Sequence, residues 1–212
     1  GLYRENGLQV PVRTAARRLL LVQPRAVVVA AGATESLPPF GNNDLPGVYA
    51  GRALARLVHT HHVLPGRRAV VAGGGEEADA VAARLREAGC EIVAQVGLRP
   101  GPRGHLIKAR GRARVADVVV AGADGAERKV PCDLVAVVGT TSALVDLARH
   151  AGAHLAWRNG AFAVAVGADG ATSAPGVWAC GEVTGPCSPA QAAAQGERSG
   201  RAAAAFAAGG TR

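Results

Sequence analysis

A glycine-rich turn between residues 73 and 78 is the clearest chemical signal in the sequence. Its pattern is Gly73-x-Gly75-x-x-Ala78, with Gly74 between the two glycines. In such a pattern the first glycine makes a tight turn, the second lets the backbone approach a pyrophosphate, and a small third residue lets a helix pack closely. The spacing therefore predicts a dinucleotide-binding turn at the N-terminus of a helix.

Charged residues near this turn bear on which nucleotide it binds. Glu76 and Glu77 place carboxylates in the first helical turn, where they stabilise the helix but repel an anionic ligand. The next strand ends near Gly97 without an acidic residue to hold a ribose 2′-hydroxyl, whereas Arg99 favours a 2′-phosphate. We expect NAD(H) or NADP(H) to bind weakly here. The alternative is a relic nucleotide-binding unit kept for its packing.

The elements around the turn alternate in type. A short buried strand over residues 69–72 leads into it, and a helix follows to Ala88, with Gly89 as its C-terminal cap and a strand at 91–96 behind it. This order is the opening of a doubly wound sheet, so we expect an α/β fold with a Rossmann-like parallel sheet. Further strands are expected at 13–22, 25–31, 113–121, 127–131, 133–138, 161–166 and 177–179, and helices at 50–59, 142–151 and 189–208.

Two other short segments with small residues follow apolar strands. The first is Ala31-Gly32-Ala33, and the second is Gly181-Glu182-Val183. After the second segment, Ser188 as N-cap and Pro189 as first helical residue begin the last helix, whose N-terminus favours negative charge. We expect residues 181–189 to face a cofactor. The alternative is that the glycines only shape a turn and Ser188 only caps a helix.

These two segments resemble elements of pyridine-nucleotide-dependent flavoproteins. Residues 30–33 are similar to the ATG element, with Ala31 in place of its threonine, and residues 178–183 to the AxGD element, with Glu182 in place of its aspartate. The resemblance implies that Glu182 contacts the flavin ribityl chain and that the next helix points at the isoalloxazine ring. It also implies a Rossmann-like NAD(P)-type domain at 48–140, inserted in a partial, glutathione-reductase-like flavin domain at 1–47 and 141–212.

A closer resemblance is to the alpha subunits of heteromeric sarcosine oxidase and the related opine dehydrogenases. It rests on segments 40–48, 63–70 and 98–100, which occur in the same order. It implies a nucleotide- and flavin-binding subunit of an amine-oxidising flavoprotein oxidoreductase, with FAD (or FMN) in the complete protein. An FAD-type GxGxxG is not present upstream, so we expect a fragment that lacks this N-terminal segment and is inactive alone. A flavin-bearing oxidase subunit is its expected partner, and no catalytic residue is assigned.

Two other functions remain open at this point. The first is a fragment of an NAD(P)H-dependent flavin reductase, which the same motifs would suit. The second is a structural or interaction module whose nucleotide sites have decayed, as the carboxylates at Glu76, Glu77 and Glu182 would suggest.

Composition excludes several other classes. A chain of 212 residues that is 49% hydrophobic can form a globular core, but no apolar run approaches the roughly 20 residues that span a bilayer. With only 3% aromatic residues, the net charge of +8 indicates a solvated basic surface rather than nucleic-acid binding. The four cysteines form no CxxC, and they are too few for a disulfide scaffold, so we expect a reducing cytoplasm. His59, His61 and His62 have no acidic or cysteine neighbour, so we expect no metal site.

Overall fold

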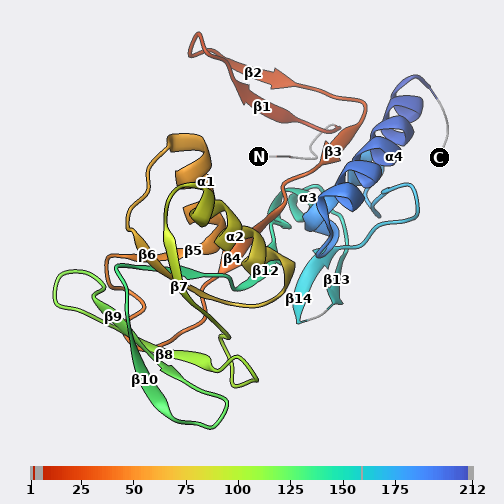
Figure 1. Ribbon diagram of the computed structural model, residues 1–212. Helices are drawn as coiled ribbons and strands as arrows, with labels where there is room; N and C mark the ends of the chain where they lie inside the picture. The colour runs from red at the N-terminus through yellow and green to blue at the C-terminus, as the bar shows by residue number, and fades with distance from the viewer. Residues whose placement is uncertain (1, 3–6, 159, 210–212) are drawn as a thin grey trace. The chain divides into compact units, whose positions relative to one another are not determined.

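The structure is a computed structural model that describes residues 2, 7–158 and 160–209. Its contacts divide the chain into two units (Figure 1): unit 1 comprises Gly1–Thr34 and Thr141–Arg212, and unit 2 comprises Glu35–Thr140. The chain passes between the units in β4 (Ala33–Ser36) and β12 (Thr140–Ala143), which form a two-stranded sheet.

The boundary after residue 34 differs from the one that the sequence suggested after residue 47. Residues 35–47 pack with unit 2 because Phe40 and Leu45 lie against its core. The N–H of Gly41 also donates a hydrogen bond of 3.1 Å to the carbonyl oxygen of Ile107. The loop is thus held by burial of its apolar side chains and by backbone pairing.

Unit 2 is built around a four-stranded parallel sheet with the strand order β5-β11-β6-β7. A three-stranded antiparallel sheet, in the order β10-β9-β8, connects β7 to β11. The elements are β5 (Val48–Ala50), α1 (Gly51–His61), β6 (Arg68–Ala72), α2 (Gly75–Glu87), β7 (Glu91–Val96), β8 (His105–Arg110), β9 (Asp117–Ala121), β10 (Glu127–Pro131) and β11 (Leu134–Val137).

The parallel sheet of unit 2 is buried on both faces, because successive side chains of a strand point to opposite sides. Ala69 and Val71 of β6 join one apolar cluster with Leu54 of α1 and Leu85 of α2. The alternate residue Val70 joins a second cluster with side chains of the antiparallel sheet. Unit 2 therefore has helices on one face and the antiparallel sheet on the other (Figure 1). The expected α/β class with a parallel sheet is confirmed.

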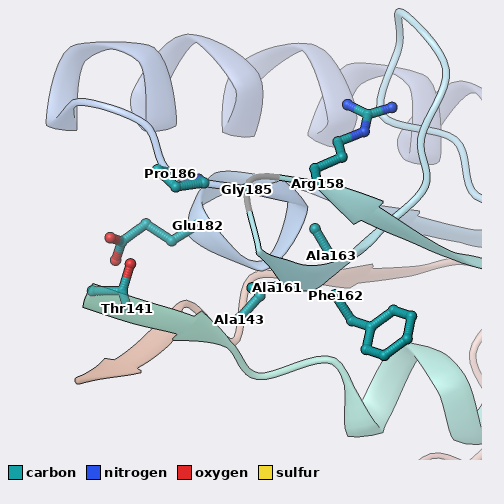
Figure 2. A pocket seen from close by; sticks show the side chains of 9 residues that line it. All are labelled: Thr141, Ala143, Arg158, Ala161, Phe162, Ala163, Glu182, Gly185 and Pro186. Carbon is teal, nitrogen blue, oxygen red and sulfur yellow. The ribbon is translucent and has the colours of Figure 1, made fainter. Parts of the chain in front are cut away.

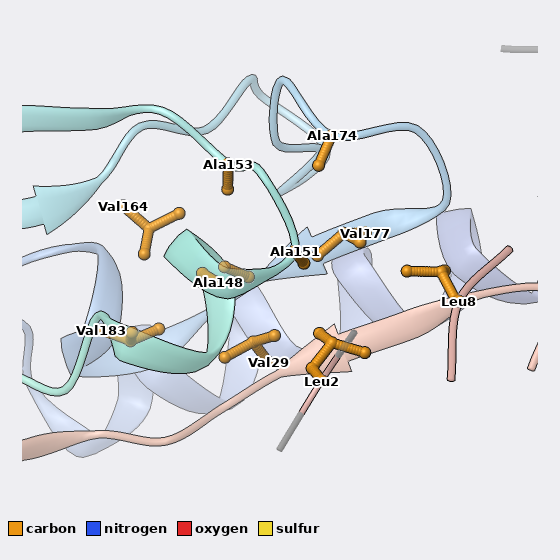
Figure 3. Close-up of a cluster of buried hydrophobic side chains, with 11 residues drawn as sticks. Leu2, Leu8, Val29, Ala148, Ala151, Ala153, Val164, Ala174, Val177 and Val183 are labelled. Atoms are coloured by element: carbon orange, nitrogen blue, oxygen red, sulfur yellow. The ribbon is translucent and has the colours of Figure 1, made fainter. Parts of the chain in front are cut away.

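Unit 1 contains a two-stranded parallel sheet of β3 and β15, two antiparallel hairpins and the long C-terminal helix. Its core joins residues from both ends of the chain (Figure 3), with Val29, Val164 and Val177 among them. The elements are β1 (Val10–Arg13), β2 (Leu19–Val22), β3 (Val27–Val29), α3 (Asp146–His150), β13 (Leu155–Arg158), β14 (Ala161–Val164), β15 (Val177–Ala179), the 3₁₀ helix η1 (Gly181–Thr184) and α4 (Pro189–Ala207).

Two elements differ from the expectation. The predicted strand at 13–22 is a hairpin, because Arg17 adopts a left-handed φ of 57° and the hydroxyl of Thr14 accepts a 3.2 Å hydrogen bond from the N–H of Arg18. The predicted helix at 142–151 is instead strand β12 followed by the short α3. The first residues of that stretch pair in an extended conformation with β4, so helix formation starts only at Asp146.

Candidate functional sites

The glycine turn of unit 2 joins β6 to α2, and its three glycines have different surroundings. Gly73 has a φ of 154°, and a Cβ there would lie 2.5 Å from the carbonyl oxygen of Val138. Gly75 has a left-handed φ of 75°. Gly74 has ordinary extended angles, is exposed, and has no atom within 4 Å of the position that a Cβ would occupy. The conformation of the turn therefore requires glycine at positions 73 and 75. At Gly74 the space beside the backbone is empty.

Helix α2 starts at this turn with no side chain capping it. The N–H of Gly73 donates a 2.8 Å hydrogen bond to the carbonyl oxygen of Val96, which fixes the turn beside the end of β7. Ala78 is 1% exposed and packs into the core between the helix and the sheet. These features suit the close approach of a phosphate group.

Four charged side chains lie at the N-termini of α1 and α2. The guanidinium of Arg52 forms an ion pair with the carboxylate of Glu77, through Nε and Oε1. The backbone N–H of Arg52 donates a 2.8 Å hydrogen bond to Oε2 of Glu35. Glu35 thereby caps α1, whose own N-cap residue, Ala50, has no side chain that could do so. Glu76 is exposed and forms no ion pair with any residue in the described part of the chain.

Burial raises the pKa of Glu35 above its usual value, although the hydrogen bond from the Arg52 N–H favours the carboxylate. The negative charge of Glu77 adds to the rise. Because the pKa is higher in the folded state, the contribution of Glu35 to stability is complete at acidic pH and is lost as pH rises through its folded-state pKa.

Replacement of Glu35 tests this arrangement. Glu35→Gln keeps an acceptor for the α1 N–H groups but cannot ionise, so we expect it to be more stable than the wild type at pH 7 and equally stable near pH 4. Glu35→Ala removes the cap and is expected to lose about 1 kcal/mol. Denaturant unfolding at both pH values, with hydrogen exchange of the α1 amides, measures these differences. A wild type more stable than Glu35→Gln at pH 7 would contradict the effect of burial.

The segment after β7 holds the other two residues predicted for the nucleotide. Gly97 lies in a tight loop, where a Cβ would come within 2.8 Å of the carbonyl oxygen of Arg99 and 2.9 Å of that of Gly104. The side chain of Arg99 is exposed. Gly97 is thus needed where the loop turns back closely on itself. That Arg99 favours a 2′-phosphate stays a prediction.

In unit 1 the other two predicted segments lie side by side. Strands β3 and β15 pair in parallel, with Val29 opposite Ala179, so Ala31-Gly32-Ala33 and Gly181-Glu182-Val183 leave the sheet at the same edge. The N–H of Cys180 donates a 3.1 Å hydrogen bond to the carbonyl oxygen of Val29. Gly32 and Gly181 have left-handed φ values of 71° and 76°. In α/β sheets ligands bind at this edge.

Most backbone N–H groups at the start of α4 already have a hydrogen-bond partner within the chain. Ser188 forms a capping box with Gln191, in which each side chain accepts from the other's backbone N–H, at 3.2 and 2.9 Å. Pro189 has no N–H, and the N–H of Ala192 is bonded to the carbonyl oxygen of Ser188. Among the described hydrogen bonds, this leaves only Ala190 in the first turn without a partner, so the helix end attracts an anion mainly through its dipole.

The neighbouring 3₁₀ helix is bonded both within itself and to α4. The N–H of Gly181 donates a 2.8 Å hydrogen bond to Oε1 of Gln195, and the hydroxyl of Thr184 donates one of the same length to the carbonyl oxygen of Gly181. Val183 is fully buried in the core of unit 1. Among the predicted residues Gly181, Glu182 and Val183, it is therefore Glu182 whose half-exposed polar side chain could contact a ligand.

A small pocket in unit 1 is lined in part by Glu182 (Figure 2). Thr141 reaches it from β12, Arg158 and Phe162 from the hairpin of β13 and β14, and the hydroxyl of Thr141 points toward the carboxylate of Glu182. Its space of about 40 Å³ holds one or two water molecules. Glu182 is the acidic side chain of this pocket, and the described residues that line it do not enclose a group as large as an isoalloxazine ring.

The cysteines and histidines supply no further site in the part of the chain that the structure describes. Cys90, Cys132 and Cys180 are buried and Cys187 is partly buried, and all four are free thiols. Burial raises the pKa of each, that of Cys132 to about 11. Within the described residues no cluster of side chains is suited to a metal ion. No helix there is long and apolar enough to cross a membrane.

Several residues at these sites carried no signal in the sequence. Glu35 and Arg52 meet only because β4 leads into the edge of the sheet where α1 begins. Thr141 and Arg158 reach the pocket through strands that the sequence pattern did not predict. Gln195 could have been noted, because it lies one helical turn after Gln191 in α4.

Comparison with known proteins identifies the class. No protein-family model matches the chain. L-proline dehydrogenase from P. horikoshii superposes with a TM-score of 0.68 at 22% identity, over 87% of this chain and 35% of that one. An FAD-dependent pyridine nucleotide-disulphide oxidoreductase from Desulfovibrio vulgaris gives a TM-score of 0.64 at 20% identity, over 92% of this chain and 58% of that one. The chain has the fold of the FAD/NAD(P)-dependent oxidoreductase superfamily.

Two sequence relatives make the comparison more specific. Sarcosine oxidase subunit alpha of Rhizobium meliloti (strain 1021) is 31% identical over 168 residues, which cover 73% of this chain and 16% of that subunit. Bilirubin reductase of Mediterraneibacter gnavus (strain CC55_001C) is 38% identical over 81 residues, which cover 38% of this chain and 12% of that enzyme. The chain thus has the fold of the superfamily and is similar to sarcosine oxidase alpha over most of its own length, while it spans under a fifth of either relative.

Proposed function

We propose that this chain is part of the flavin- and nucleotide-binding subunit of an amine-oxidising flavoprotein oxidoreductase of the sarcosine oxidase alpha kind. The observation that carries the proposal is the similarity to sarcosine oxidase subunit alpha over 168 residues. The fold of L-proline dehydrogenase, whose name also describes oxidation of a secondary amine, supports it. A flavin bound to such a subunit supplies the two-electron chemistry, and the protein supplies binding and orientation.

Within this proposal, Glu182 is the flavin contact of unit 1. Its carboxylate lies at the edge where β3 and β15 end, beside the start of α4. A carboxylate accepts hydrogen bonds from polyol hydroxyls, and the dipole of α4 favours negative charge on a group near its N-terminus. Ala31, Gly32 and Ala33 would form the backbone surface beside it, because they leave the same sheet edge.

The experiment measures flavin content in the native assembly, with the flavin-bearing partner subunit that we propose. Glu182→Ala is expected to lower the bound flavin several-fold while leaving the circular dichroism spectrum and the unfolding midpoint unchanged, since a half-exposed carboxylate adds little stability. Glu197→Ala, an exposed carboxylate on α4, is the matched control and should retain flavin. Full flavin content and amine-dependent reduction in Glu182→Ala would show that the assignment of Glu182 is wrong.

A second candidate function has its own observation. The match to bilirubin reductase favours a fragment of an NAD(P)H-dependent flavin reductase, which would take electrons from a nicotinamide bound at residues 73–78. Anaerobic reduction of the flavin in the native assembly separates the two. Bleaching by sarcosine or proline supports the amine oxidoreductase, and bleaching by NADH or NADPH alone supports the reductase.

A further inference from the structure

A pair of exposed aromatic rings lies on the hairpin of β13 and β14 in unit 1. Trp157 and Phe162 are 64% and 55% exposed, and their ring centroids are 4.8 Å apart in an edge-on arrangement. The chain has two tryptophans, and the other one, Trp178, is 1% exposed. Because folding buries most aromatic surface, an exposed pair of this kind is typical of a surface that another molecule covers.

The two rings continue the apolar core of unit 1. Trp157 pairs with Phe162 across the hairpin, and two residues along the strands Leu155 pairs with Val164. Side chains two residues apart point to the same face of a strand, so all four side chains share one face. Val164 is buried in the core and Leu155 packs against it, whereas the rings reach beyond the core. Within the described residues, the inner end of this apolar face is therefore covered and its outer end is not.

The charges of the surrounding segment have one sign. Between Asp146 and Asp169 the chain contains two arginines and two histidines and no carboxylate. All four are exposed: Arg149, His150, His154 and Arg158. Arg158 directly follows Trp157 and has no ion-pair partner in the part of the chain that the structure describes. A protein that covers the rings therefore binds best with an apolar surface that has carboxylates beside it.

The same charges disfavour a second copy of this chain as the covering molecule. Two copies in contact through their rings would bring like charges together at Arg158, and this segment would supply no carboxylate to either side. The net charge of +8 on each copy adds to the repulsion. Tryptophan and arginine are also the residue types that contribute most to binding between protein subunits. The surface thus suits a different, acidic subunit.

We propose that Trp157 and Phe162 bind the flavin-bearing subunit of the proposed assembly, which offers an apolar recess bordered by carboxylates. Arg158 forms an ion pair with one of these carboxylates. The inference rests on the proposed function for the presence of that subunit. Phe162 also lines the pocket of Glu182 (Figure 2), so the contact brings the partner beside the candidate flavin edge of unit 1.

Photo-crosslinking in the native assembly identifies the molecule that covers the rings. A benzophenone amino acid is incorporated in place of Phe162, the assembly is irradiated, and the crosslinked peptides are sequenced by mass spectrometry. We expect a crosslink to the flavin-bearing subunit, in a segment that contains both apolar and acidic residues. The sample without irradiation is the control.

The dissociation constant between the two subunits measures the contribution of each side chain. Trp157→Ala is expected to raise Kd about 30-fold or more, as for the residues that dominate an interface, and Trp157→Phe less than Trp157→Ala. Arg158→Glu should raise Kd about tenfold at low salt and less at high salt. Arg201→Glu, the same charge change at an 80% exposed side chain of α4, is the matched control and should stay within about twofold. Circular dichroism and the unfolding midpoint check that each variant is folded.

Several outcomes would overturn the proposal. They are a crosslink that stays within the same polypeptide, a crosslink between two copies of this chain, an unchanged Kd in Trp157→Ala, and an assembly with no second kind of subunit. Equal effects of Arg158→Glu and Arg201→Glu would contradict the ion pair of Arg158. A subunit that crosslinks at position 162 in an assembly that does not oxidise an amine would instead contradict the proposed function and leave the contact.

Discussion

Replacing Trp178 with alanine is expected to lower the free energy of unfolding of unit 1 by about 3–5 kcal/mol. Trp178 is 1% exposed in β15, opposite Val28 of β3, and its ring centroid lies 5.4 Å from that of Phe206 in α4. The substitution would leave a cavity between the parallel strands and the C-terminal helix. These elements also carry Gly181 and Glu182, so the candidate flavin edge should loosen with the core.

Trp157 provides a matched control for this prediction. It is 64% exposed on β13 and stacks edge-on against Phe162, with ring centroids 4.8 Å apart. Trp157→Ala should change stability by no more than about 0.5 kcal/mol. Denaturant titrations followed by circular dichroism, with hydrogen exchange of the α4 amides, measure both variants. Equal losses in the two would contradict the distinction between the buried and the exposed ring.

The second large effect is expected at Gly73, where alanine should lower the stability of unit 2 by about 1–3 kcal/mol. An added Cβ would lie 2.5 Å from the carbonyl oxygen and 2.7 Å from the Cβ of Val138, and the φ of 154° is one that side chains avoid. Neither neighbour can move easily, because Val138 is 5% exposed and its N–H donates a 2.7 Å hydrogen bond to the carbonyl oxygen of Ala72.

Gly74→Ala is the control, one residue along the same turn. Its φ is ordinary and no atom lies within 4 Å of the added methyl group, so stability should stay within about 0.5 kcal/mol of wild type. Hydrogen exchange of the β6 and β11 amides reports on unit 2 in both variants. A destabilised Gly74→Ala would mean that the turn as a whole, rather than the contact with Val138, demands glycine.

The sequence predicted the elements whose pattern is local. The strand at 91–96, the strand at 127–131 and the start of α4 at Pro189 lie where periodicity and capping residues placed them. Gly89 has the left-handed φ of 84° that a helix C-terminal cap requires. In these cases the residues that decide the structure are neighbours along the chain.

Features that depend on distant pairing could not be predicted. Strand β8 shows no apolar alternation strong enough to separate it from a loop, and it exists because it pairs with β9. The cap that Glu35 provides for α1 and the ion pair of Arg52 with Glu77 join residues on separate elements. The sequence identified Glu77 as a carboxylate that opposes a nucleotide, but it held no sign of the cation that faces it.

The pairing of β3 with β15 has a consequence for the order in which the protein folds on the ribosome. Residues 35–140 are contiguous, so unit 2 can fold as soon as it has been synthesised. Strand β3 emerges before it and pairs only when Val177 and its neighbours appear, on the order of ten seconds later at usual rates of translation. During that interval Val29 of β3, which is 4% exposed in the folded chain, lacks its core neighbours Val164 and Val177. Unit 1 can therefore complete its parallel sheet and core only after unit 2 has been synthesised.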